Sequence, residues 1–236
     1  MIDRKNTGKK ETKNIMRKNV ALKYVIMTCL LASLLCGLLA GCGQKGGESA
    51  QAPEEAVTLH VGAGTFKPVS TVTIGQHAMH SETIIVRKSL IQNLIAQLGK
   101  PIIPVGTTST RTLESLYWIG MMLHEQGMVM RPLHVEQWFP YEEHKPLSTT
   151  EALQLVLDYL ECHSLTRLEA STALMIAPSY KMRIITGLIT NFHQPKSTLL
   201  LLVSALIGER WEDCYRFALD HGFRFLSYGD SCLFLP

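Results

Sequence analysis

The stretch GTTSTRTLESLYWIGMMLHEQG, residues 106–127, decides the architecture that the sequence predicts. The segment from Thr107 to Gln126 has the character of one long helix, and Gly127 closes it. The preceding PIIPV, residues 101–105, predicts a short buried strand. A strand that leads directly into a long helix is the repeating unit of an α/β protein, which predicts the same alternation on both sides.

The flanking sequence continues this alternation of strands and helices. Ser148 and Glu151 have the spacing of a capping box, which predicts a helix from there to about Cys162. Further helices are expected over residues 89–98, 197–206 and 211–221, and strands over residues 57–64, 173–177, 183–192, 223–226 and 232–235. The sequence therefore predicts an α/β fold, a mainly parallel sheet with flanking helices.

The N-terminal region has the composition of a secretory signal. Residues 1–23 carry eight basic residues against two acidic ones, and residues 24–41 carry no charge. The sequence LAGC at residues 39–42 resembles a lipobox, in which the thiol of Cys42 would be lipidated. We expect residues 1–42 to be a lipoprotein-like signal or a membrane anchor, and residues 43–56 a flexible tether; a chance apolar stretch is the remaining alternative.

Charge and cysteine content limit the class of the remaining chain. The net charge of the whole chain is +3, and the first 23 residues contribute more than that, so the rest is slightly acidic. A nucleic-acid partner would therefore need a local basic patch. Cys162, Cys214 and Cys232 are too few and too scattered for a disulfide framework, which suits a reducing compartment.

The segment VTLHVGAGTF, residues 57–66, ends a predicted strand in glycines. Gly62 and Gly64 would let backbone approach a ligand closely, and His60 lies on the strand face opposite Leu59 and Val61. A plain strand end with a tight turn explains the same residues. Because the segment lacks the GxGxxG pattern, it supports no dinucleotide site.

Imidazole and carboxylate groups are concentrated in HAMHSE, residues 77–82. His77, His80 and Glu82 are ordinary zinc or iron ligands, but in an extended segment His77 would point away from the other two. A polar active-site wall or a plain surface segment are the alternatives to a metal site. We expect no bound metal.

Hydroxyl groups surround the start of the long helix in GTTSTRTLES, residues 106–115. Amide groups at a helix N-terminus form an anion site, to which Thr107, Thr108 and Arg111 could contribute hydrogen bonds and charge. The segment lacks the lysine and the spacing of a P-loop. Capping of the helix by a threonine explains the hydroxyls equally well.

Two further polar segments lie near the C-terminus. NFHQPKST, residues 191–198, places Asn191 and His193 at a strand end before a helix, where open α/β sheets bind ligands. A simple strand-to-helix turn is the alternative. SYGD, residues 227–230, has the composition of a turn, in which Tyr228 and Asp230 could also close a site.

Taken in order, these motifs resemble one enzyme family. TLHVGAGTFKPV, HAMHSE, VGTTSTRTLES, GLITNFHQPKSTLLLLVSA and RFLSYGD are similar to the S-adenosylmethionine:tRNA ribosyltransferase-isomerases of queuosine biosynthesis. The likeness covers residues 57–236, so this range would be a partial copy of the family fold with its N-terminal half absent. Where the family has aspartate, HLP and PGY, this chain has Thr186, His193-Gln194-Pro195 and Pro178-Ser179-Tyr180.

The resemblance implies an activity and a set of site residues. The family transfers and isomerises the ribosyl group of S-adenosylmethionine onto 7-aminomethyl-7-deazaguanine in tRNA, giving epoxyqueuosine without a metal. His193 and His60 would be catalytic. The residues implied to bind substrate are Gly62, Gly64, Thr65, His80, Glu82, Thr107, Thr108, Arg111, Asn191, Tyr228 and Asp230.

The signal and the enzyme motifs imply different locations. Transfer RNA and S-adenosylmethionine are cytoplasmic, whereas the leader would place the chain at a membrane. One expectation is a cytoplasmic enzyme region, with a separate chain supplying the missing half. The rival expectation is a truncated, inactive, membrane-anchored lipoprotein that uses the α/β scaffold as a binding module.

Overall fold

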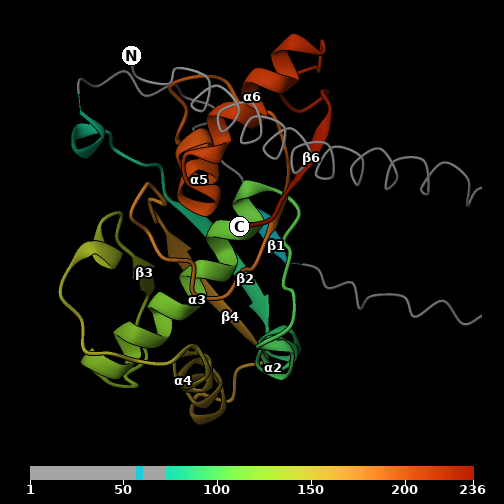
Figure 1. Ribbon diagram of the computed structural model, residues 1–236. Coiled ribbons are helices and arrows are strands. Elements are labelled where there is room, and N and C mark those ends of the chain that lie inside the picture. Colours follow the sequence, from blue (N-terminus) through green and yellow to red (C-terminus); the bar gives the residue numbers. More distant parts are fainter. Residues whose placement is uncertain (1–56, 61–72) are drawn as a thin grey trace, which may run out of the picture.

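The structure is a computed structural model that describes residues 57–60 and 73–236 (Figure 1). The predicted signal at residues 1–42 with Cys42, and the tether at residues 43–56, lie outside the described residues. The same holds for Gly62, Gly64 and Thr65. His60 is placed by its backbone in strand β1, Thr58–His60.

Helix α3, Thr107–Gln126, is the centre of the molecule and has the predicted bounds. Every residue from Thr110 to Leu123 is buried, as expected for a helix that is covered on all sides. Gly127 ends the helix with a φ of 83°, and its N–H donates to the carbonyl of Leu123. In Figure 1, α3 crosses in front of the main sheet.

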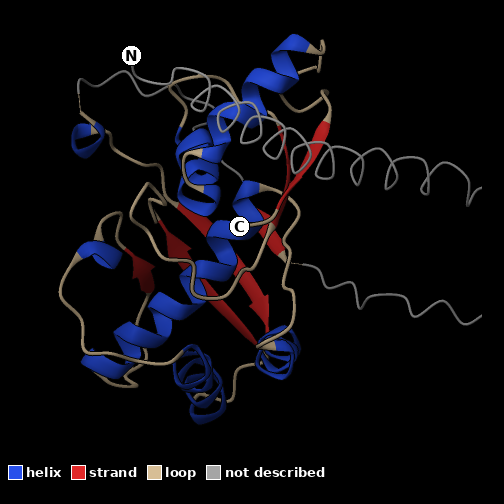
Figure 2. Cartoon of the chain, in the orientation of Figure 1, coloured by secondary structure: helices blue, strands red, loops and turns tan. Residues whose placement is uncertain are grey.

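The described strands form two sheets, shown as red arrows in Figure 2. The four-stranded sheet has the order β1-β2-β4-β3, with β2 at Glu82–Arg87, β4 at Arg167–Thr172 and β3 at Leu133–Val135. Only the β3–β4 pair in this sheet is parallel. The second sheet pairs β5, Leu188–Asn191, with β6, Ser231–Phe234, in antiparallel fashion.

The prediction of a mainly parallel sheet is therefore wrong for the described strands. It assumed that each strand is followed by a crossover helix, as in βαβ units. Strands β2, β3 and β4 were not predicted, and the pairing of β2 with β1 and with β4 makes the main sheet mostly antiparallel. The coarser prediction of an α/β fold is confirmed, because helices pack on a mixed sheet.

The main sheet has one buried face and one exposed face. Along β2 and β4 the buried and exposed residues alternate, so that Ile84 and Val86 lie on the same covered face as Leu168. Helix α3 packs against this sheet, α2, Lys88–Gln97, contacts β2, and α4, Thr149–Cys162, packs on α3 and α2 (Figure 1). The opposite face carries the exposed or half-buried members of β2 and β4.

Helix α4 begins with the predicted capping box. The Ser148 hydroxyl accepts a hydrogen bond from the Glu151 N–H at 3.2 Å, and the Glu151 carboxylate accepts one from the Ser148 N–H at 2.9 Å. These bonds satisfy two amide groups that lack helical partners. Helix α4 then packs along α3 in the most extensive helix–helix contact of the described chain.

The remaining predicted helices are confirmed to within about two residues. They are α2, α5 at Thr198–Ile207 and α6 at Arg210–Asp220. Two short 3-10 turns, at Ile74–Gln76 and Phe139–Tyr141, complete the helical elements of the described residues. In Figure 1, α5, α6 and β6 lie at the opposite end of the molecule from α2 and α4.

Three predicted strands are wrong. Residues 101–105 contribute one parallel bridge between Val105 and Ile189, and Val105 is 68% exposed rather than buried. Residues 173–177 are buried but irregular, because the regular ladder ends at Thr172. Residues 223–226 form a turn region whose bond toward β5 runs from the Leu226 N–H to the Phe192 carbonyl, just beyond the strand, and no ladder forms there. Apolar composition alone therefore predicted strand geometry wrongly in all three segments, and it predicted burial correctly only for residues 173–177.

Close contact between α3 and α4 generates a stability prediction for Gly120. A Cβ atom at this position would overlap the backbone of Ala152 in α4. We expect Gly120→Ala to lower the free energy of unfolding by about 1–3 kcal/mol, because one of two packed helices must shift. Urea unfolding measures this change.

Gly75→Ala is the matched control, because a Cβ at Gly75 meets no atom within 4 Å. The packing argument fails if Gly120→Ala unfolds at the same urea concentration as the Gly75→Ala variant.

Candidate functional site

Arg111 and Glu82 form a buried ion pair between α3 and β2. The Arg111 Nη1 lies 2.9 Å from the Glu82 Oε2, and the two side chains are 3% and 1% exposed. The Arg111 Nε donates to the Leu174 carbonyl, and its Nη2 lies 3.4 Å from the Thr172 carbonyl. Burial lowers the pKa of Arg111, and the Glu82 charge opposes that effect. The guanidinium group therefore donates its hydrogen bonds to acceptors inside the protein.

His80 extends this pair toward solvent. Its Nε2 lies 2.9 Å from the Glu82 Oε1, and 21% of its side chain is exposed. Gln137 holds the preceding backbone, because its side-chain amide accepts from the Met79 N–H and donates to the His77 carbonyl. The predicted residues His80, Glu82 and Arg111 thus lie in one continuous row. Gln137, which the sequence analysis missed, fixes the segment that leads into it.

The structure gives no support to metal ligation by HAMHSE. Among residues 57–60 and 73–236, no three His, Cys, Asp or Glu side chains are grouped so that they could hold a metal ion. His77 contributes its backbone carbonyl to Gln137, while Glu82 is engaged with Arg111. Of the side chains that suggested a metal site, those of His80 and Glu82 are used for internal hydrogen bonds.

The N-terminus of α3 lies beside strand β5. Gly106, and no threonine, occupies the capping position, and its N–H donates to the Ile189 carbonyl at 2.7 Å. Thr107 is buried at this end and Thr108 is half-buried. The alternative of capping by a threonine is therefore wrong, because the capping residue carries no side chain. Both threonines remain placed at the first turn, next to the strand that leads to Asn191.

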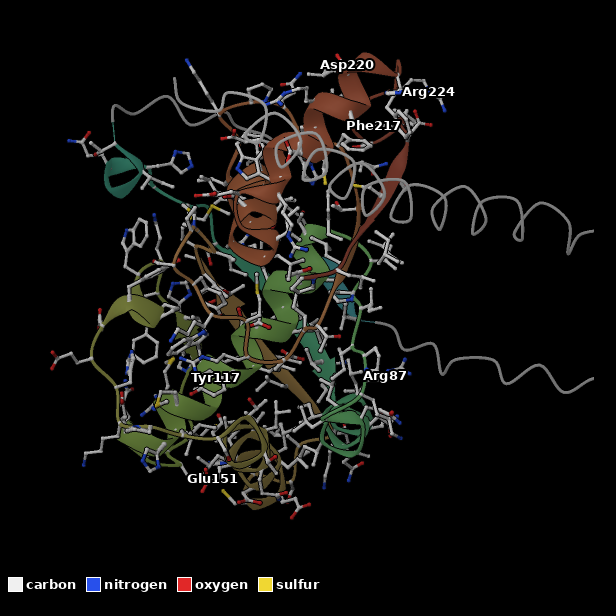
Figure 3. All side chains as sticks on the ribbon, in the orientation of Figure 1. Arg87, Tyr117, Glu151, Phe217, Asp220 and Arg224 are labelled. Atoms are coloured by element: carbon white, nitrogen blue, oxygen red, sulfur yellow. The ribbon has the colours of Figure 1, made fainter. Side chains whose placement is uncertain are left out.

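A second polar cluster forms where β5 ends. The Asn191 side-chain amide lies 3.3 Å from the carbonyls of Gly229 and Asp230. The Asp230 carboxylate accepts a hydrogen bond from the Arg224 N–H at 2.7 Å. This bond joins the end of the predicted turn, residues 227–230, to the residues that precede it. Arg224 lies at the far end of the molecule from Glu151 of α4 (Figure 3). Tyr228, at 97% exposed, points into solvent and does not join the cluster.

His193 is buried just beyond this strand end. It is 8% exposed, its Nε2 lies 3.1 Å from the Thr190 hydroxyl, and its N–H donates to the Tyr215 hydroxyl. Burial lowers the pKa of His193 to about 4. The imidazole is therefore neutral near pH 7. Among the described hydrogen bonds, none joins this cluster to the row of His80, Glu82 and Arg111.

Glu114 is a buried carboxylate that the sequence analysis missed. It accepts hydrogen bonds from the Tyr180 hydroxyl and from the N–H groups of three consecutive residues, Arg183, Ile184 and Ile185. Burial raises its pKa, and these hydrogen bonds oppose the rise. An acidic residue close before the apolar run at residues 116–123 was the available signal. Its four donors identify it as a structural anchor.

The Tyr180 hydroxyl also connects Glu114 to an aromatic group on α3. The Trp118 Nε1 donates to this hydroxyl at 2.8 Å. The Arg183 guanidinium lies 5.0 Å from the ring centre of Tyr117, a cation–π arrangement. Figure 3 labels Tyr117 in the lower half of the molecule, on α3.

A surface groove of about 710 Å³ lies away from all the predicted site residues. It runs between the start of α2 and the end of α4, and its lining includes Arg87, Lys88 and Glu161. Lys88 and Glu161 form an ion pair of 2.9 Å. Because none of the predicted site residues lines the groove, we do not assign it to the predicted substrate site.

The fold and these polar groups define a mixed α/β protein with a buried ionic row and a neutral buried histidine. Comparison with known families extends this description. The family described as queuosine biosynthesis protein matches residues 47–234. The chain belongs to this family.

Individual relatives carry a more specific name. An S-adenosylmethionine:tRNA ribosyltransferase-isomerase of Synechococcus sp. is 38% identical over 202 residues, which cover 84% of this chain and 43% of the relative. The protein of the same name from Novosphingobium aromaticivorans is 39% identical over 185 residues, 77% of this chain and 42% of the relative. The chain thus spans about two fifths of the length of these relatives.

A solved structure is also similar to part of the chain. The S-adenosylmethionine tRNA ribosyltransferase of Thermotoga maritima is 28% identical, with a TM-score of 0.42. The match covers 65% of this chain and 41% of the Thermotoga chain.

None of the helices in the described ranges combines the length and apolar character needed to cross a bilayer.

The burial of His193 generates a pH prediction. The unfolded chain binds a proton on this imidazole below about pH 6.5, whereas the folded chain resists protonation until about pH 4. The unfolded state therefore holds more protons in this window, and stability falls as pH falls. We expect wild type to lose about 2–3 kcal/mol more than His193→Gln between about pH 7 and about pH 4.5.

Urea unfolding of both proteins at the two pH values gives this difference. His124→Gln, a change at an exposed histidine, is the control and should lose as much stability as wild type. Equal acid losses for wild type and His193→Gln would contradict the assignment of the pH effect to burial.

The turn before Tyr180 generates a second stability prediction. Ser179 has a φ of 85°, in the region that side chains disfavour. We expect Ser179→Gly to raise the free energy of unfolding by about 0.5–1 kcal/mol, after allowing for the added freedom of glycine in the unfolded chain. Thermal melting of Ser179→Gly and of Ser179→Ala, which retains the Cβ atom, checks this. A gain in the alanine variant would show that strain at φ is not the cause.

Proposed function

We propose that this chain takes part in the reaction for which its relatives are named. The reaction transfers the ribosyl group of S-adenosylmethionine to 7-aminomethyl-7-deazaguanine in tRNA and isomerises it to give epoxyqueuosine. The family match over residues 47–234 is the observation that carries the proposal. Since the chain spans about two fifths of its relatives, the activity of the chain by itself is part of what is proposed.

We infer that the substrate site forms around the start of α3 and the end of β5. Thr107 and Thr108 lie at a helix N-terminus, where amide groups favour an anionic group such as the methionine carboxylate. Asn191 lies at the adjoining strand end, with His193 two residues on. The parallel bridge between Val105 and Ile189 brings these two segments together.

The remaining site residues are proposed on the family resemblance. Gly62, Gly64 and Thr65 would line the cavity with His60, and Tyr228 and Asp230 would close the pocket from the turn. His60 and His193 are the proposed catalytic histidines. No metal takes part in this proposal, and S-adenosylmethionine is a substrate.

We infer a cytoplasmic location, because both substrates of the proposed reaction are found there. The alternative is a membrane-anchored lipoprotein lipidated at Cys42, which binds a ligand without catalysis. A separate chain that supplies the rest of the family fold would be an additional partner of the enzyme form. Lipid labelling of Cys42, followed by membrane fractionation, would support the anchored alternative.

Release of adenine tests the proposed function directly. The full chain is incubated with S-adenosylmethionine and a tRNA that carries the 7-aminomethyl-7-deazaguanine precursor, and adenine is quantified by chromatography. We expect release that depends on the tRNA, and a decrease of about 10²-fold or more in His193→Ala.

His124→Ala is the matched control and should retain the wild-type rate, because His124 is exposed at the far end of α3. Absence of tRNA-dependent adenine release from the wild-type chain would reject catalysis by this chain and favour the binding module. An unchanged rate in His193→Ala would remove His193 from the catalytic group while retaining the activity.

A further inference from the structure

The groove between the start of α2 and the end of α4 carries an excess of positive charge. Its volume is about 710 Å³, and three cationic side chains line it, those of Arg87, Lys88 and Arg167. One carboxylate, that of Glu161, also lines it. Because the chain beyond residue 23 is slightly acidic as a whole, this excess is a local feature of the groove.

Two of these cations face each other across neighbouring strands. Arg87 ends β2 and Arg167 begins β4, and the two residues are direct partners in the antiparallel register. Like charges in such a pair repel each other and destabilise a sheet. An anion that binds between the two guanidinium groups removes this repulsion and accepts charge-assisted hydrogen bonds from both.

Carboxylates of the protein leave part of this charge uncompensated. Among the residues that the structure describes, Arg87 has neither an ion pair nor a side-chain hydrogen bond. Lys88 pairs with Glu161 at 2.9 Å, and Arg167 pairs with Glu169 at 2.6 Å. The side chains of both pairs are 30–59% exposed, and exposed pairs contribute little to stability, so a phosphate can replace either carboxylate.

Neutral hydrogen-bond donors lie between the charged groups of the groove. The lining includes Ser89, Gln92, Ser164 and Thr166, which are exposed and whose side chains have no hydrogen-bond partner within the described ranges. The Lys88 N–H donates to the Thr166 carbonyl at 3.0 Å, which joins the two walls of the groove. Hydroxyl and amide groups beside arginine and lysine are the side chains that contact phosphate oxygens.

A third arginine extends the positive charge beyond the groove. Arg131 lies two residues before β3, which runs parallel to β4, so Arg131 and Arg167 lie at the same end of the sheet. The Arg131 Nη2 is buried without a hydrogen-bond partner among the described residues. Adjacent strands lie about 4.8 Å apart, so arginines on three neighbouring strands span roughly 10 Å. This span fits a chain of phosphate groups better than a single phosphate ion.

We propose that this groove, with Arg131 beside it, binds the phosphate backbone of an RNA at a site separate from the reacting groups. The choice of RNA rests on the proposed function, in which a tRNA is a substrate. Helices α2 and α4 lie at the opposite end of the molecule from α5, α6 and β6, and Arg87 lies beside α2 (Figures 1 and 3). The groove therefore holds a part of the RNA remote from the modified base, and such contacts fix position without reading sequence.

The first test measures binding of a tRNA transcript to the full chain by fluorescence anisotropy, over a series of salt concentrations. We expect Arg87→Gln combined with Arg167→Gln to weaken binding by about 10-fold at low salt. The slope of log K against log salt should become shallower by about 2, because each lost phosphate contact removes up to about one.

Arg210→Gln combined with Arg216→Gln is the matched control. It removes two exposed arginines from α6, at the opposite end of the molecule, and leaves the same net charge as the groove variant. We expect it to retain the wild-type slope. Melting temperatures of both double variants report any loss of folding.

Glu161→Gln is expected to tighten binding. The change removes the carboxylate that competes for Lys88, so an additional phosphate contact should form. We expect about 3-fold higher affinity at low salt and a slope steeper by up to about 1. A groove with a merely structural role would give no such gain. Glu209→Gln, which removes an exposed carboxylate at the start of α6, controls for net charge.

The second test is the release of adenine by the groove variant. We expect Arg87→Gln combined with Arg167→Gln to raise the KM for tRNA by about 10-fold and to leave kcat unchanged. This pattern follows because a contact remote from the reacting groups is equally strong in the ground state and the transition state. A lower kcat with unchanged KM would contradict a remote binding role.

The outcomes separate this inference from the proposed function. Unchanged tRNA affinity and slope in the groove variant would overturn the groove, even if wild type releases adenine. Weaker binding in that variant, with no adenine release from wild type, would retain the groove and reject catalysis by this chain. Absence of tRNA binding by wild type would overturn the inference, as would groove-dependent binding to vesicles of phosphatidylcholine and phosphatidylserine alone, which would indicate a membrane surface instead.

Discussion

A helix buried on all sides must satisfy its polar side chains inside the protein, and this constraint organises the structure around α3. Arg111 and Glu114 lie almost one turn apart on this helix, and each has partners in a different part of the chain. Arg111 contacts β2 and the end of β4, whereas Glu114 binds the segment from Tyr180 to Ile185. The charged residues of α3 therefore set the position of the main sheet relative to the segment that leads into β5.

The two candidate clusters follow from this arrangement. The row of His80, Glu82 and Arg111 depends on the start of β2 meeting the first turns of α3. The cluster at Asn191 depends on β5 lying beside Gly106, through the Ile189 carbonyl. Because both clusters are attached to the first part of the same helix, a substrate that contacts its N-terminus is near elements that carry each of them.

Local signals in the sequence predicted the helices well. Gly127 and the pair Ser148–Glu151 act through backbone geometry and hydrogen bonds within a few residues, so the bounds of α3 and α4 could be predicted. Strand direction depends on partners far apart in the chain, and β2 and β4 pair across about 85 residues. For the same reason the motifs identified His80, Glu82 and Arg111 separately, while their contact required the fold. Glu114 was missed because its four donors lie 66 to 71 residues away.

The three consecutive amides that bind Glu114 have a consequence for the dynamics of the chain. Arg183, Ile184 and Ile185 belong to no helix or strand, and such segments ordinarily exchange their amide hydrogens rapidly. Here each N–H donates a hydrogen bond to the carboxylate of Glu114, a fully buried residue of the central helix. Opening of this segment requires exposure of that carboxylate, and hence separation from α3. The unit that resists local unfolding therefore includes an irregular segment, and its limits differ from those of the secondary structure.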